Sequence, residues 1–132
     1  MPTAKQIDAI LPYLELFSRE GISAGTWSGE PGYLPSFSMA KEVSEFLDAL
    51  YQQGWISDTF NWPDWQESAA RYLEDSSLVA SADVQTIRKL LTTHARKERF
   101  CEGHFAAVIE SGHIAALLRR LKKIRVFAAS DC

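Results

Sequence analysis

The sequence predicts a mainly α-helical fold, and three observations support this class. Apolar residues recur every three or four positions in several segments, as on one face of a helix. Helix-start and helix-end signals frame these segments, for example the Thr3–Gln6 capping box and a glycine at position 54. The length of 132 residues is ordinary for one domain. We therefore expect one compact domain of about six helices over residues 1–132, with its core at about 3–127.

The first half of the chain carries two of the expected helices. The first follows the Thr3–Gln6 capping box, and Pro12 lies opposite its apolar stripe. Because proline removes a backbone hydrogen bond, we expect the helix to kink or divide there. Ser38 is the expected cap of the second helix. The apolar stripe of that helix contains Val43, Phe46, Leu47, Leu50 and Tyr51.

A stretch without helical spacing, residues 22–37, separates these two helices. It contains three glycines, two prolines and the aromatic residues Trp27, Tyr33 and Phe37. A loop of this length packs across its domain or covers a pocket, and we expect packing. A short strand pair near residues 23–27 is a weakly signalled alternative.

The second half predicts several shorter helices. Asn61-Trp62-Pro63 indicates a helix start, because proline is favoured in the first turn. Another helix begins near Ser81 or Asp83, and its apolar side includes His94. A bend is expected at residues 96–101, followed by two helices separated by Ser111-Gly112. The apolar stripe of the last helix contains Ile114, Leu117, Leu118, Leu121 and Ile124.

Composition excludes several classes of protein. No apolar run approaches the roughly 20 residues that a membrane span needs, so we expect no membrane partner. The first ten residues do not read as a signal peptide. The two cysteines, Cys101 and Cys132, form no disulfide framework. A cytoplasmic location is therefore the expectation. No phosphate loop or dinucleotide fingerprint is present, and we predict no cofactor.

The charges are unevenly distributed along the chain. The net charge is −3, yet most acidic residues precede position 86 and most basic residues follow it. Two halves of opposite charge can attract each other within the fold. The alternative is a basic face that binds an anionic partner.

The densest run of alternating charge gives the candidate binding residues. These residues are Arg96, Glu98, Arg99, Glu102 and His104. If the run is buried, arginine–carboxylate pairs would fix the bend. We expect Phe100 to enter the core. At least one of Arg96 and Arg99 should then hold an internal carboxylate, for example that of Asp64 or Glu67, or several backbone carbonyls. If the arginines are free, they form an anion pocket.

Two other chemistries remain open at the level of sequence. A small helical enzyme would need a pocket where Arg96, Arg99 and His104 converge. A helix–turn–helix reading of residues 103–123 would use the last helix against nucleic acid, and this reading is not favoured. Its basic face would consist of Arg119, Arg120, Lys122 and Lys123. We predict no metal, because the three histidines are nine and ten residues apart, wider than usual zinc-ligand spacings.

The run from Thr92 to Gly103 resembles a known family. It contains Thr92, Arg96, Glu98-Arg99-Phe100 and Gly103 in the order T-x-x-x-R-x-E-R-F-x-x-G. This signature is similar to that of a family of small uncharacterised microbial proteins, a domain of unknown function. The aromatic segment from Phe60 to Trp65 also resembles the family pattern. The resemblance implies no activity, cofactor or substrate, but it points to these positions.

The sequence thus leaves the function unknown, and whether the protein is an enzyme stays open. The leading hypothesis is a cytoplasmic, non-catalytic binding or protein-interaction domain with an Arg/Glu/His patch. Its expected partner is a protein or a small anionic ligand.

Overall fold

The structure is a computed structural model that describes residues 2–29 and 31–130, with side chains up to position 126. The described residues form eight α-helices, one short 3-10 helix and a two-stranded antiparallel sheet. The elements in chain order are α1 (Ala4–Ile10), α2 (Tyr13–Phe17), β1 (Gly25–Ser28), β2 (Ser36–Met39), α3 (Lys41–Gln52), η1 (Trp62–Trp65), α4 (Gln66–Glu74), α5 (Ser76–Val79), α6 (Val84–Lys97), α7 (His104–Glu110) and α8 (His113–Ser130). The mainly α-helical prediction is confirmed.

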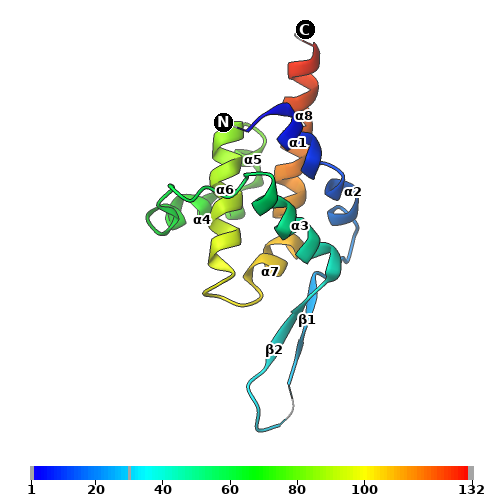
Figure 1. The fold of residues 1–132 in the computed structure, drawn as a ribbon, viewed down its shortest axis with the longest axis vertical. Helices are drawn as coiled ribbons and strands as arrows, with labels where there is room; N and C mark the ends of the chain where they lie inside the picture. The colour runs from blue at the N-terminus through cyan, green and yellow to red at the C-terminus, as the bar shows by residue number, and fades with distance from the viewer. Residues whose placement is uncertain (1, 30, 131–132) are drawn as a thin grey trace.

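Helix α8 lies at the centre of the fold. It contacts α1, α2, α5, α6 and α7, and Figure 1 shows it running alongside α6. Ile114, Leu117, Leu118 and Leu121 of its predicted stripe are completely buried. Burying one such side chain contributes about 1.5–3 kcal/mol to stability. One continuous apolar core, built around α8, therefore joins the two halves of the chain.

The N-terminal prediction is confirmed in detail. Thr3 accepts from the backbone N–H of Gln6, and the Gln6 side chain accepts from the backbone N–H of Thr3. The helix ends at Ile10, and Pro12 begins the separate helix α2. The proline thus divides one amphipathic segment into two helices. Together with the single turn α5, which Asp75 caps, this division raises the helix count above the expected six.

The segment 22–37 differs from the prediction of a loop packed across the domain. Most of it belongs to the β1–β2 hairpin, which projects from the helical body in Figure 1. Trp27 lies opposite Phe37, with ring centroids 5.1 Å apart. Tyr33 and Leu34 near the hairpin tip are 74% and 92% exposed. The rings of Trp27 and Phe37 pack against each other across the two strands, so the segment does not need to cover the core.

The prediction that Ser38 caps α3 is also wrong. Ser38 lies in β2, paired with Thr26, and the helix begins at Lys41 after the N-cap residue Ala40. Ala40 donates its N–H to the Ala24 carbonyl at 2.9 Å. The hairpin pairing therefore extends up to the start of the helix and displaces the cap by two residues.

Two polar contacts hold the middle of the chain against α6. Thr92 is completely buried, and its hydroxyl donates to the Trp55 carbonyl and accepts from the Ser57 N–H.

Asp83 caps the start of α6 by accepting from the Thr86 N–H at 2.7 Å. Helix α6 then ends at Lys97, so the bend that we expected at residues 96–101 is confirmed. This bend carries most of the predicted site residues.

Candidate functional site

The loop between α6 and α7 is held by one carboxylate. Glu98 accepts from the backbone N–H of Gly103 at 3.1 Å and from that of Phe105 at 2.8 Å. These two groups are among the N–H donors at the start of α7 that have no partner within the helix. Glu98 therefore caps α7, and a negative charge at that position also suits the helix dipole. In this structure Glu98 positions the loop.

The second predicted carboxylate connects the loop to the hairpin. Glu102 accepts from the backbone N–H of Phe37 at 3.0 Å. Gly103 has a φ of +88°, and a Cβ built there would lie 2.9 Å from Cζ2 of Trp27. The Ala24 N–H, just before the hairpin, donates to Glu110 of α7 at 3.2 Å. The base of the hairpin and the α6–α7 loop thus form one connected unit.

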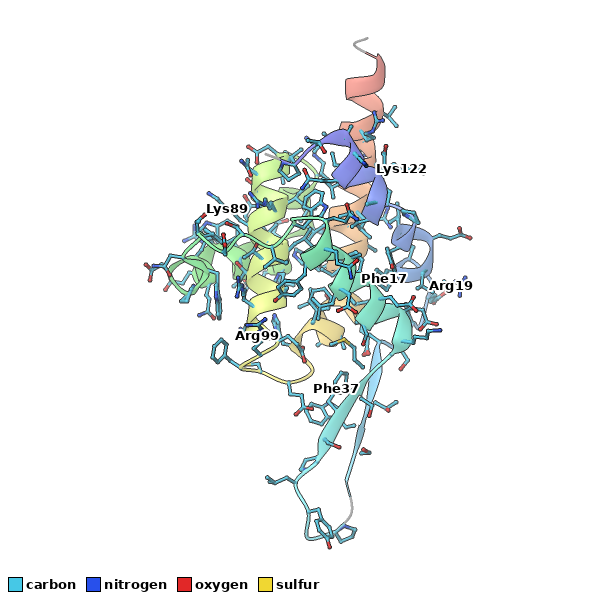
Figure 2. All side chains as sticks on the ribbon, viewed as in Figure 1. Phe17, Arg19, Phe37, Lys89, Arg99 and Lys122 are labelled. Carbon is cyan, nitrogen blue, oxygen red and sulfur yellow. The ribbon has the colours of Figure 1, made fainter. Side chains whose placement is uncertain are left out.

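The two arginines are not paired as predicted. Among the described residues, no carboxylate forms an ion pair with Arg96 or Arg99. Asp64 instead accepts from the Asn61 side chain at 2.7 Å. The Arg99 guanidinium lies 5.9 Å from the centre of the Tyr51 ring, in the range of a cation–π contact. Arg99 is exposed at the lower end of α6 in Figure 2, and Arg96 is half-buried.

The prediction for Phe100 is wrong as well. Its side chain is 76% exposed and packs against Trp62, with ring centroids 5.9 Å apart. Phe105 enters the core instead. It is completely buried, and its ring centroid lies 6.0 Å from that of Phe46. Because the chain leaves the helix after Lys97, Phe100 falls on a turn that points away from the core.

The exposed and half-buried residues at this end of α6 form one surface, which we call the α6–α7 surface. It consists of Arg96, Arg99, Phe100, Trp62 and Tyr51. The sequence analysis identified its two arginines, but it placed Phe100 in the core and Tyr51 on the apolar stripe of the second helix. The signal for the exposure of Phe100 was the charge on both sides of it, which is unusual for a core position.

The three histidines come together in the core, although they are far apart in the sequence. Nδ1 of His94 and Nε2 of His104 lie 3.1 Å apart, so one ring donates to the other. The ring of His113 packs edge-on against that of His94, with centroids 5.2 Å apart. His94, which the sequence places on the apolar side of its helix, is buried there. Nε2 of His94 and Nε2 of His113 are buried without a hydrogen-bond partner among the described residues.

Burial keeps these imidazoles neutral. The pKa of His94 falls to about 3, first because of burial and then because of repulsion from His113, His104 and Lys97. Burial lowers the pKa of His113 to about 4. The pKa of His104 is also lowered, mainly by burial, while the nearby charge of Glu98 acts in the opposite direction.

A narrow cleft between α4 and α6 reaches this histidine cluster. Its volume is about 40 Å³, which holds only a few water molecules. Lys97, His94 and His104 line it, and neither Arg96 nor Arg99 does. Of the three residues that a small enzyme would need in one pocket, Arg96, Arg99 and His104, only His104 lines this cleft. Within the described ranges, no three His, Cys, Asp or Glu side chains are arranged to hold a metal ion.

The four residues of the basic face predicted for the last helix are divided between two sides of α8. Arg119, Arg120 and Lys123 line a cleft next to α5. Lys122 lies next to α1 (Figure 2). It lines a different cavity, together with Asp8 and Glu15. Because α8 is packed against several helices, these residues do not present the single continuous face of a recognition helix.

Comparison with known proteins places the chain in a family. A sequence model described as "Family of unknown function (DUF6508)" matches residues 2–126. No curated protein and no solved structure matches the chain. None of the helices in the described part of the chain is long and apolar enough to span a bilayer. This chain therefore belongs to DUF6508, a family of unknown function, in agreement with the resemblance of the Thr92–Gly103 run.

Proposed function

We propose that this protein is a non-catalytic binding domain that holds an acidic segment of a partner protein on its α6–α7 surface. The carrying observation is that Arg96 and Arg99 have no carboxylate partner among the described residues, while Phe100 beside them is largely exposed. Arginine and large aromatic residues are the types enriched at protein interfaces. An acidic segment with an apolar side chain would satisfy both the charges and the aromatic surface.

The shape of this surface favours a protein over a small molecule. Small-molecule sites are concave and enclose most of their ligand. Neither Arg96 nor Arg99 lines the cavities described between α4 and α6, between α5 and α8, next to α1, or next to α2. Phe100 and Trp62 instead offer a packed aromatic pair next to the charges. A small enzyme with its pocket at Arg96, Arg99 and His104 is the less supported alternative.

The charge of the surface favours a protein over nucleic acid. The loop that presents the arginines also carries Glu98 and Glu102, and the whole chain has a net charge of −3. A nucleic-acid binder relies on many phosphate contacts from a predominantly basic face. Two arginines next to aromatic side chains suit a short acidic segment better.

We place this function in the cytoplasm. Cys101 is an exposed free thiol on the same loop. Exposed free thiols are ordinary where the environment is reducing, and they become oxidised where it is not.

The test is a titration followed by backbone NMR. Synthetic peptides that combine several Asp or Glu residues with one Phe or Trp are compared with the same peptides carrying Asn and Gln. We expect the acidic peptides to shift the amides of the α6–α7 loop, and Arg99→Gln to weaken binding about tenfold. Loss of one charge-assisted contact accounts for a change of this size.

Arg19→Gln is the matched control, because Arg19 is an exposed arginine on the far side of the molecule, after α2 (Figure 2). It should leave the affinity unchanged. The proposal fails if the neutral peptides bind equally well, or if Arg99→Gln and Arg19→Gln weaken binding to the same extent.

A further inference from the structure

A second basic region lies in the cleft between α5 and α8. The cleft has a volume of about 200 Å³. Val79, Ala80 and Ala116 supply its apolar part, and the cations come from α8. Arg119, Arg120 and Lys123 follow Ala116 at intervals of three, four and seven residues. This spacing places all four residues on one side of the helix.

No ion pair among the described residues neutralises the three cations of this cleft, although Arg119 also lines a neighbouring cavity that contains Glu20 and Glu110. None of the residues that line it is acidic. The ion pairs among the described residues join Lys41 to Glu45 and Arg125 to Asp8, and neither pair involves the three cations of the cleft. Three positive charges therefore gather around a space that a small anion can enter.

One of the three cations is held in a fixed orientation. Arg120 is half-buried, and its Nε donates to the Ala82 carbonyl at 2.8 Å. This bond leaves the N–H groups of the two terminal nitrogens available as donors. Arg119 is held more loosely, with Nη2 3.5 Å from the Ser18 hydroxyl. A pre-oriented guanidinium loses less conformational entropy when it binds an anion.

We propose that this cleft binds the phosphate group of a small phosphorylated molecule. A phosphate carries up to two negative charges and matches the fork of an arginine side chain. Ser76, which also lines the cleft, adds a hydroxyl donor. The apolar part of the cleft would receive a short carbon chain or ring attached to the phosphate. The volume is below the usual range for drug-sized ligands, so the molecule is small.

A nucleic acid fits the cleft less well than a single phosphate group. Lys122, which lies between Arg120 and Lys123 in the sequence, faces α1 and shares its cavity with Asp8 and Glu15. These acids would repel a second phosphate on that side. The cleft is also separate from the α6–α7 surface, because α5 precedes α6 and the loop follows it, at the opposite end of that helix (Figure 1).

The experiment is an NMR titration of the full chain at constant ionic strength with inorganic phosphate and with phenyl phosphate. We expect saturable shifts at the amides of Ala80 and Ala116, with tighter binding of phenyl phosphate. Lys123→Gln should weaken binding about tenfold, because it removes a charged donor. Arg119→Gln is a second variant that also leaves the Arg120–Ala82 bond intact.

Lys122→Gln is the matched control on the same turn of α8, with the same change in charge, and should not alter the affinity. The proposal is overturned if no shift saturates, or if Lys122→Gln and Lys123→Gln weaken binding equally, which would indicate unspecific attraction. It is also overturned if a single-stranded oligonucleotide shifts these amides while neither phosphate compound does.

Discussion

At the scale of single residues, Gly103 has the most constrained role in the α6–α7 loop. Its φ of +88° belongs to the left-handed region, and its missing side chain leaves room for the Trp27 ring. Glycine adopts this conformation without steric cost, whereas an alanine there costs roughly 1–2 kcal/mol. Trp27 and Glu102 depend on the same turn, so a single backbone conformation sets the position of the hairpin.

We expect Gly103→Ala to reduce the free energy of unfolding by about 1 kcal/mol more than Gly112→Ala. Gly112 has the same φ of +88°, but a Cβ there would have no neighbour within 4 Å. The difference between the variants therefore isolates the displaced contact with Trp27, for which about 1 kcal/mol is typical of aromatic packing. Urea denaturation of both variants measures this difference. Equal losses would show that the Trp27 contact adds nothing to stability.

At the scale of elements, α6, α7 and α8 each bring one histidine to the same buried point. The folded protein keeps His94 and His113 neutral well below the pKa of about 6.5 that an unfolded chain shows. Between pH 6.5 and 4 the unfolded state therefore binds more protons than the folded state. Stability must fall as the pH decreases through this window.

The expected loss between pH 7 and pH 5 is about 2 kcal/mol for each of these two histidines. His104, whose pKa is also lowered, changes stability in the same direction. Urea denaturation at several pH values measures the total. In His113→Leu the loss of stability between pH 7 and pH 5 should be smaller by roughly 2 kcal/mol. The burial of these rings would be disproved by a stability that does not change between pH 7 and pH 5.

At the scale of the whole molecule, the opposite charges of the two halves are not matched by a network of ion pairs. Among the described residues, one ion pair joins the halves, between Arg125 and Asp8 at 3.0 Å, and both side chains are partly exposed. Other arginines of the basic half bond to backbone carbonyls, as Arg88 does to Gly54. Apolar burial around α8 therefore holds the halves together.

We accordingly expect the stability to depend weakly on salt. Raising NaCl from 0.1 to 0.5 M should change the free energy of unfolding by less than about 1 kcal/mol, because exposed ion pairs contribute little. Chloride is the appropriate anion, since sulfate strengthens apolar burial by itself. A loss of several kcal/mol would mean that attraction between the charged halves stabilises the fold.

The sequence by itself determined the helical class, the capping box at Thr3, the division at Pro12 and the buried stripes of α6 and α8. These features depend on residues that are close together in the chain, so local propensity and spacing are sufficient to predict them. The bend after Lys97 belongs to the same group. Membership of a family of unknown function was also expected from the sequence, and the family model matches residues 2–126.

Only the tertiary structure decided which side chains of the bend are buried. We had assigned Phe100 to the core, but it lies exposed on the turn after α6, and Phe105 of α7 is buried in the core instead. The same long-range packing brings three distant histidines into contact and leaves Arg96 and Arg99 without internal carboxylates among the described residues. Such contacts depend on how helices cross, which the spacing of residues within one helix does not specify.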